Sequence, residues 1–329
     1  MVKGDNMLNN TLINKPDSKY DHMINNKIRK NTNKNKIKEG SLAFNIALYT
    51  LAGFFALIAI YPMYYVMIMS ISKPMDVAAR NVYLFPTGFV TSAYSFVLKD
   101  PILWSSFKNS VLYVILTTII KLVLCVLAAY PLSMPRLAGR KYVVWFLLIP
   151  MYFSGGMIPS FLNITRLGLY NSIWAVVLPA SVAIWHIILT RTYFTTSIPN
   201  TLREAAMIDG ANHYKTLFNI YLPLAKPILA VIAIYTIVSV WNSWFSATIY
   251  LPDPKKHPLQ MYLKKMLVDN TQFETYSSIE EAEQAIVNQM VKMQLQYAVI
   301  VITTVPILMV YPFLQKYFVK GIMIGSLKG

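Results

Sequence analysis

The chain has 329 residues, of which 56% are hydrophobic and 13% charged, and it carries a formal net charge of +16. With a mean hydropathy of +0.46, this composition exceeds the apolar content that a soluble core requires, and it excludes an ordinary soluble domain. We expect no nucleic-acid partner, because membrane insertion and anionic lipid account for the positive charge. A single cysteine, Cys125, rules out an intrachain disulfide.

The N-terminal segment, residues 1–42, is polar. Its first 40 residues contain nine Lys or Arg, nine Asn and four acidic residues, and they show no apolar period. This composition predicts a disordered basic tail near anionic lipid on the cytoplasmic side, with a specific docking role as the alternative. The segment has no apolar core of the kind found in a cleaved signal peptide.

The rest of the chain, residues 43–329, contains six apolar runs. Each is long enough to cross about 30 Å of hydrocarbon as a helix. We therefore expect an all-α membrane protein with six transmembrane helices. The expected spans are residues 44–70, 110–132, 142–162, 173–189, 228–250 and 296–318.

The distribution of Lys and Arg predicts the orientation of these spans. With the N-terminus inside, the inside segments carry 19 of the 30 Lys and Arg, and the outside loops carry 10. Since cytoplasmic loops retain positive charge, we expect both termini and the loop 191–227 to be cytoplasmic and the loop 251–292 to be external. The remaining basic residue, Lys121, lies within the second span.

Lys121 lies roughly 20 Å from the cytoplasmic end of its span at the rise of an α-helix. An ionisable group at this depth has two explanations. It lies on a substrate path, or it serves the structure by pairing with another group or by snorkelling to the interface. In the third span, the Gly155–Gly156 pair indicates close helix packing or a cavity wall. His186 in the fourth span indicates packing or a gate, and with four unclustered His in the chain we expect no metal site.

A polar island separates the fourth and fifth spans. Pro199 favours a helix start, Thr201 and Glu204 have the spacing of a capping box, and Gly210 suits a left-handed stop. These signals predict a short helix from about Pro199 to Asp209. Asn212 then predicts the cap of a second helix, which Pro223 interrupts.

The fifth span contains Trp241, Asn242, Ser243 and Trp244, a polar and aromatic group in an otherwise apolar helix. Such a group faces protein or a cavity. The alternative is that both Trp rings belong to an interfacial belt.

The polar island also carries a motif: Glu-Ala-Ala, then Gly after three residues, then Ile-x-Leu-Pro after nine more. This spacing resembles the cytoplasmic coupling loop of binding-protein-dependent ABC importer permeases. The ends of the third and fifth spans (residues 153–159 and 241–244) and residues 318–329 are similar to the maltose-type carbohydrate branch, and more narrowly to its complex-polysaccharide and oligosaccharide permeases. The residues that the resemblance assigns to ATPase coupling are Glu204, Ala205, Ala206, Asp209, Gly210, Ala211, Phe218, Leu222 and Pro223.

This resemblance implies a type I ABC importer permease fold and a place in the cell (cytoplasmic or inner) membrane. It implies no catalytic residues and no cofactor on this chain, with ATP and Mg bound by a partner ATPase dimer. It further implies a second permease subunit, usually a different chain, an extracytoplasmic substrate-binding protein and an oligosaccharide substrate. On that substrate's path we expect Trp241, Asn242 and Trp244, with Lys121 as a candidate charge contact for uronic acids.

Other functions remain as alternatives. All fourteen carboxylates lie outside the expected spans, which is unfavourable for a stand-alone ion-coupled carrier. An intramembrane hydrolase would need Ser154 and His186 together with a third orienting residue. No phosphate-binding loop is present, since Asp209 and Tyr214 occupy the two glycine positions before Lys215-Thr216. An ABC permease for another small polar solute is the nearest alternative.

Overall fold

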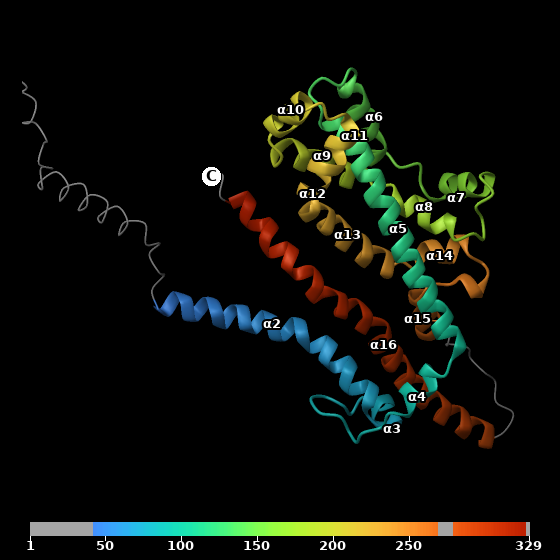
Figure 1. Cartoon of the computed structure of the whole chain (residues 1–329). Helices are drawn as coiled ribbons and strands as arrows, with labels where there is room; N and C mark the ends of the chain where they lie inside the picture. Colours follow the sequence, from blue (N-terminus) through green and yellow to red (C-terminus); the bar gives the residue numbers. More distant parts are fainter. Residues whose placement is uncertain (1–41, 269–278, 327–329) are drawn as a thin grey trace, which may run out of the picture. The chain divides into compact units, whose positions relative to one another are not determined.

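The computed structural model describes residues 42–268 and 279–326, and within these ranges every regular element is a helix (Figure 1). The expectation of an all-α chain is confirmed. Apart from Leu42, the basic tail predicted over residues 1–42 lies outside the described residues, as do residues 327–329.

The contacts divide the chain into two units, Met1–Met63 and Tyr64–Gly329, and the boundary falls inside the first helix. The described part of the first unit is apolar and mostly exposed, as expected of a helix that lipid surrounds. All other described helices belong to the second unit.

Four helical segments are long and apolar enough to cross a bilayer within the described residues. Two further pairs of helices pass the same test only when each pair is taken as one span, so the described chain has four to six spans. The expected six spans thus require both pairs to cross. The four segments are α2 (Leu42–Ile71), α5 (Pro101–Ser133), α8 with α9 (Trp174–Ser181 and Ile184–Thr196) and α16 (Ile279–Ser326).

The third expected span is not continuous, since α6 (Arg140–Tyr152) and α7 (Met157–Arg166) are bent by 115° relative to each other. Between them, Gly156 adopts a φ of +88°, which L side chains rarely occupy. The Ser154 hydroxyl accepts a hydrogen bond from the Gly156 N–H (3.2 Å). The span expected over residues 142–162 is therefore interrupted by a turn at Gly156.

The fifth expected span, residues 228–250, is shorter as a continuous helix than expected. α13 (Lys226–Trp241) ends early, and the chain continues as the short helix α14 (Phe245–Tyr250). At the break, the Asn242 side chain donates to the Val238 carbonyl (2.9 Å). The Asn242 N–H keeps its helical bond to the same carbonyl (3.2 Å), so Asn242 is the C-cap residue of α13.

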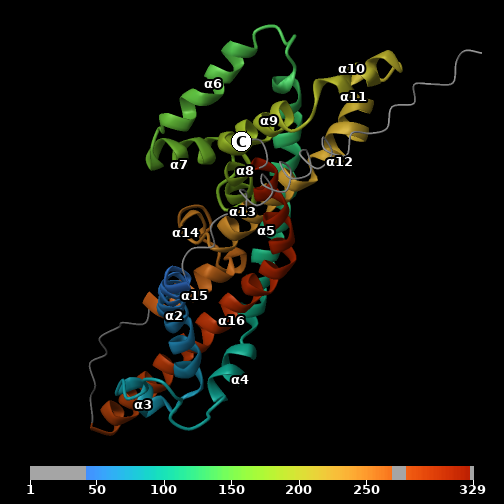
Figure 2. The same ribbon diagram turned by 90° about the vertical axis from the view of Figure 1, so that its left-hand side faces the viewer.

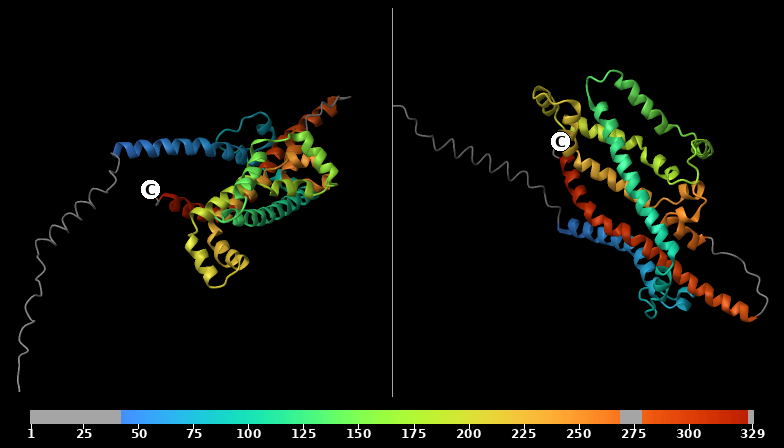
Figure 3. Two further views of the ribbon diagram at one scale, coloured as in Figure 1. Left: turned by 90° about the horizontal axis from the view of Figure 1, so that it is seen from above. Right: turned by 45° about the vertical axis from the view of Figure 1, so that its right-hand side comes forward.

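Helix α5 contacts α8, α9, α13 and the later helix α15 (Leu259–Val268), as Figures 2 and 3 show from several sides. One face of α5 is buried along its length, and this face is rich in polar residues. Its members recur every three or four residues, the spacing of one side of a helix. We call this row the α5 seam: Leu103, Ser106, Ser110, Tyr113, Thr117, Lys121, Cys125 and Ala129.

Helix α16 contacts α13, α15 and the two short helices α3 (Pro74–Ala78) and α4 (Ser92–Leu98). Its fully buried Gln294 holds the chain that leaves α2. The Gln294 Nε2 donates to the carbonyls of Ser72 (2.8 Å) and Val90 (3.3 Å). One side-chain amide therefore joins three segments that are distant in sequence.

Candidate functional site

The predicted ATPase-coupling motif begins with α10 (Asn200–Ile208), which lies within a residue of the expected range. Its end also has the predicted geometry, since Gly210 adopts a φ of +77°. The Ala211 N–H donates to the Ala206 carbonyl (2.8 Å), and the Gly210 N–H donates to the Met207 carbonyl (3.1 Å). These two bonds form a Schellman motif, which fixes the direction in which the chain leaves α10.

The start of α10 differs from the prediction. Pro199 precedes the first helical turn without a side-chain cap, and Thr201 lies inside the helix. The expected capping box of Thr201 with Glu204 is therefore wrong. The Glu204 carboxylate is instead 63% exposed and lies 3.9 Å from the Arg203 guanidinium.

The second helix begins and ends close to the expected positions. The Asn212 side chain accepts a backbone hydrogen bond (2.8 Å) as the N-cap of α11 (His213–Thr216), which confirms its predicted role. A π-helical turn, η1 (Leu217–Tyr221), and then α12 (Leu222–Leu224) follow without a break. This segment ends one residue after Pro223 and is bent by 72° relative to α13, so the predicted interruption near Pro223 is confirmed.

The π-turn packs against the end of α5 and against α9. The ring centroid of Tyr221 lies 5.0 Å from that of Tyr130 and 5.3 Å from that of Phe194. Leu217 and Ala225 are buried in the same apolar core. The two short helices are thereby fixed to two of the helices that are long enough to span a membrane.

Arg203, which sequence reasoning missed, adds a polar contact at the same junction. Only 12% of its side chain is exposed, and its Nη1 donates to the Sδ of Met134 (3.1 Å), the residue after α5. No local pattern connects these residues, because they lie 69 positions apart. Arg203 therefore ties α10 to the end of α5.

The two short helices also carry exposed apolar side chains. Ile208 is 87% exposed and Tyr214 is 74% exposed. Exposed apolar side chains of this kind are the surface that a protein partner buries. We call this set the coupling face: Leu202, Met207, Ile208, Tyr214 and Phe218. Of the other predicted coupling residues, Ala205, Asp209 and Pro223 are exposed, Ala211 and Leu222 are half-buried, and Ala206 is buried.

Lys121 lies on the α5 seam and is only 6% exposed. It is close to Cys125 on the same helix and to His186 on α9. The His186 ring lies in turn 6.4 Å from the Tyr235 ring of α13. Within residues 42–268 and 279–326, the Lys121 ammonium has no ion-pair or hydrogen-bond partner. The role of Lys121 on a substrate path stays a prediction.

The three other predicted path residues occupy different environments. Trp241 is 5% exposed, its indole N–H donates to the Thr303 carbonyl (3.2 Å), and its ring contacts Phe107. This side chain belongs to the core. Asn242 and Trp244 are exposed at the break between α13 and α14, so they are the members of the group that a solute could contact.

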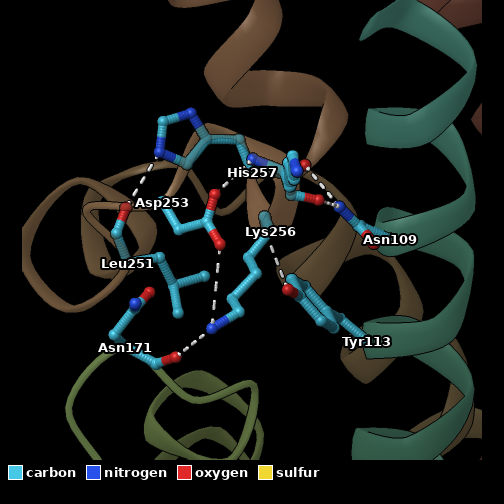
Figure 4. A network of polar contacts seen from close by, with 8 residues as sticks. Asn109, Tyr113, Asn171, Leu251, Asp253, Lys256 and His257 are labelled. Carbon is cyan, nitrogen blue, oxygen red and sulfur yellow. Dashed lines mark hydrogen bonds and ion pairs between the residues drawn. The ribbon is translucent and has the colours of Figure 1, made fainter. Parts of the chain in front are cut away.

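A polar cluster holds the segment after α14 against α5 (Figure 4). The Asn109 side chain donates to the carbonyls of Lys255 (2.7 Å) and His257 (3.1 Å). The Tyr113 hydroxyl donates to the carbonyl of Lys256 (2.7 Å). We call this segment, residues 251–258, the clamped turn, and it includes the short helix η2 (Pro254–Lys256).

Lys256 and His257 secure the other side of the clamped turn. The Lys256 ammonium donates to the Asn171 carbonyl (2.6 Å) and lies 3.9 Å from the Asp253 carboxylate. The His257 Nε2–H donates to the Leu251 carbonyl (2.8 Å). Burial lowers the pKa of His257 and outweighs the Leu251 carbonyl and the Asp253 charge, which raise it. The imidazole is therefore held in its neutral form.

Comparisons with known proteins agree with this geometry. The model of the family "Binding-protein-dependent transport system inner membrane component" matches residues 103–324. The chain is 36% identical to the polygalacturonan/rhamnogalacturonan transport system permease protein YtcP of Bacillus subtilis, over 87% of this chain and 98% of that protein. It is 35% identical to protein LplC of the same organism, over 87% and 95%. Among solved structures, it is similar to a bacterial ABC transporter involved in the import of the acidic polysaccharide alginate, with a TM-score of 0.76 and 38% identity over 85% of this chain and 98% of the matched chain.

Proposed function

Because the chain belongs to the family of binding-protein-dependent transport system inner membrane components, we propose that it is one permease subunit of an ATP-driven importer for oligosaccharides or polysaccharide fragments. The observation that carries this proposal is the coupling face on α10 and η1, fixed through Arg203 and Tyr221 to the end of α5. When a partner bound to the coupling face moves, the two short helices move with it, and their contacts with α5 pass this movement to the membrane helices.

The partner on the coupling face is a separate ATPase, which holds ATP and Mg. Ile208 and Phe218 supply apolar contact area to it, and Glu204 supplies an exposed charge. An ATPase dimer has two equivalent sites, each of which takes one permease loop, so a second permease subunit of a different sequence completes the importer. Both termini then lie in the cytoplasm of a cell whose inner membrane contains this protein.

On the other side of the membrane, an extracytoplasmic substrate-binding protein delivers the solute. The family description names such a protein as a requirement for transport. The clamped turn and α15 belong to the loop 251–292, which faces outward in the orientation that the distribution of Lys and Arg over the whole chain predicts.

The substrate is an oligosaccharide that carries carboxylates. Two observations support this choice: the similarity to the importer of the acidic polysaccharide alginate, and the unpaired, buried Lys121 ammonium. An ammonium in a poorly solvated cavity attracts a carboxylate more strongly than an ammonium in water does.

The test uses the importer isolated with its ATPase and binding protein and placed in vesicles. Uptake of tetragalacturonate and of its fully methyl-esterified form is measured for the wild type and for Lys121→Met. We expect the variant to lose uptake of the acidic sugar about tenfold, which corresponds to about 1.4 kcal/mol, and to keep uptake of the ester. The matched control is Thr117→Val, one turn away on the α5 seam, whose hydroxyl has no hydrogen-bond partner among the described residues.

Three results would contradict the proposal. Uptake that continues after the ATPase is removed would indicate a carrier that works alone. Wild-type vesicles that accumulate neither sugar would favour a permease for another small polar solute. Equal losses of both sugars in Lys121→Met would remove its role in charge recognition.

A further inference from the structure

A second cation lies beside one of the predicted path residues. The ammonium of Lys264, on α15, lies 5.2 Å from the ring centroid of Trp244. Contacts between α14 and α15 bring these residues together, including that of the Thr248 hydroxyl with the Sδ of Met261 (3.2 Å). The pair therefore results from the fold of the chain between them.

Lys264 has no carboxylate partner in the part of the chain that the structure describes. The two nearby acidic residues with described side chains are occupied: Asp100 accepts a hydrogen bond from the Tyr262 hydroxyl (2.8 Å), and Asp253 lies 3.9 Å from Lys256. Among the described residues, the Lys264 ammonium beside the exposed Trp244 ring thus has no ion-pair partner.

We propose that Trp244 and Lys264 form a carboxylate-binding subsite for an acidic oligosaccharide. This inference rests on the function proposed above and adds a recognition site to it. The exposed part of the Trp244 ring packs against the C–H groups of a sugar, while the Lys264 ammonium binds its carboxylate. The cation–π contact holds the flexible lysine in place beforehand, which reduces the entropy that binding would otherwise cost.

The subsite is separate from Lys121. α15 begins beside Ser110, whose hydroxyl accepts a hydrogen bond from the Leu259 N–H (2.7 Å). From Ser110 to Lys121 the rise along α5 is about 16 Å. The two lysines therefore provide successive charge contacts, with the Lys264 subsite nearer to the start of α5.

Lys264→Met tests the subsite, and Lys265→Met is the matched control, because it removes the same charge from the next position. The importer is purified with its ATPase and without the binding protein, so that the binding protein's own selectivity does not contribute. Calorimetry then measures binding of tetragalacturonate and of its methyl ester. We expect Lys264→Met to bind the acidic sugar about tenfold more weakly and the ester as the wild type does. Lys265→Met should change neither by more than about twofold, and Lys264→Arg should restore acidic binding.

The salt dependence gives an independent measurement. Raising the ionic strength should weaken acidic binding in the wild type and should have less effect in Lys264→Met. Equal effects of the two Lys→Met variants, or equal losses of both sugars in Lys264→Met, would overturn the subsite while leaving the proposed function intact. A wild-type importer that binds neither sugar would overturn the proposed substrate class and the subsite with it.

Discussion

Gly210→Ala tests whether the geometry of the coupling loop matters for transport. Gly210 has a φ of +77°, and a Cβ added there would meet no atom within 4 Å. The substitution therefore introduces backbone strain without a steric clash. The left-handed conformation costs an L-residue about 1–2 kcal/mol, which lowers the population of the correctly formed loop by about five- to thirtyfold where the loop is only marginally stable. We expect sugar-stimulated ATP hydrolysis to fall several-fold.

Gly168→Ala is a closely matched control. Gly168 ends α7 with the same pair of bonds, from the Gly168 N–H to the Thr165 carbonyl (3.0 Å) and from the Leu169 N–H to the Ile164 carbonyl (3.1 Å). Its φ is +69°, and an added Cβ again meets nothing within 4 Å. The same substitution therefore costs a similar strain energy at a site outside the coupling loop.

The assay measures ATPase activity and sugar uptake in vesicles, together with the amount of ATPase that co-purifies with each variant. Both variants should lower the melting temperature to a similar extent, and only Gly210→Ala should lower the number of sugars imported per ATP. Equal transport in the two variants, at equal assembly, would refute the coupling role of this turn.

Three further outcomes are expected. Arg203→Met should speed hydrogen exchange in α10 and weaken ATPase binding, because α10 loses its polar contact with Met134; unchanged exchange would exclude this anchoring role. Gln294→Leu should cost about 1–3 kcal/mol, since the buried Ser72 carbonyl loses its donor, and calorimetric melting of the variant measures this loss. Because burial lowers the pKa of His257, the folded clamped turn resists protonation that the unfolded chain accepts. The stability of the turn should therefore decrease as pH falls below about 6.5. Hydrogen exchange of its amides, corrected for the intrinsic pH dependence of amide exchange, should then become faster. His257→Gln should remove this pH dependence.

The short helices around Gly210 could be predicted because their signals are local. A left-handed glycine and an Asn cap act within a few residues, and both were found where expected. The breaks at Gly156 and Asn242 could not be predicted in the same way, because an apolar run has the same composition whether its helix is straight or interrupted. The packing around each run decides between these forms.

Contacts between distant segments were the other part that sequence reasoning missed. Arg203 meets Met134, and Asn109 meets the clamped turn 146 positions away, so neither contact leaves a periodic signal. The α5 seam is different. The polar residues Ser106, Ser110 and Tyr113 recur at helical spacing, and that pattern could have shown that this face of the helix is covered by protein.

The clamped turn has a consequence for protein engineering. Asn109 and Tyr113 bind the main-chain carbonyls of residues 255–257, and Ser110 accepts the main-chain N–H of Leu259. None of these bonds, nor those that the Lys256 and His257 side chains make, involves the side chain of Lys255. The side chain at position 255 can therefore be randomised in a library, or given a spectroscopic label, while the backbone of the turn keeps its place on α5.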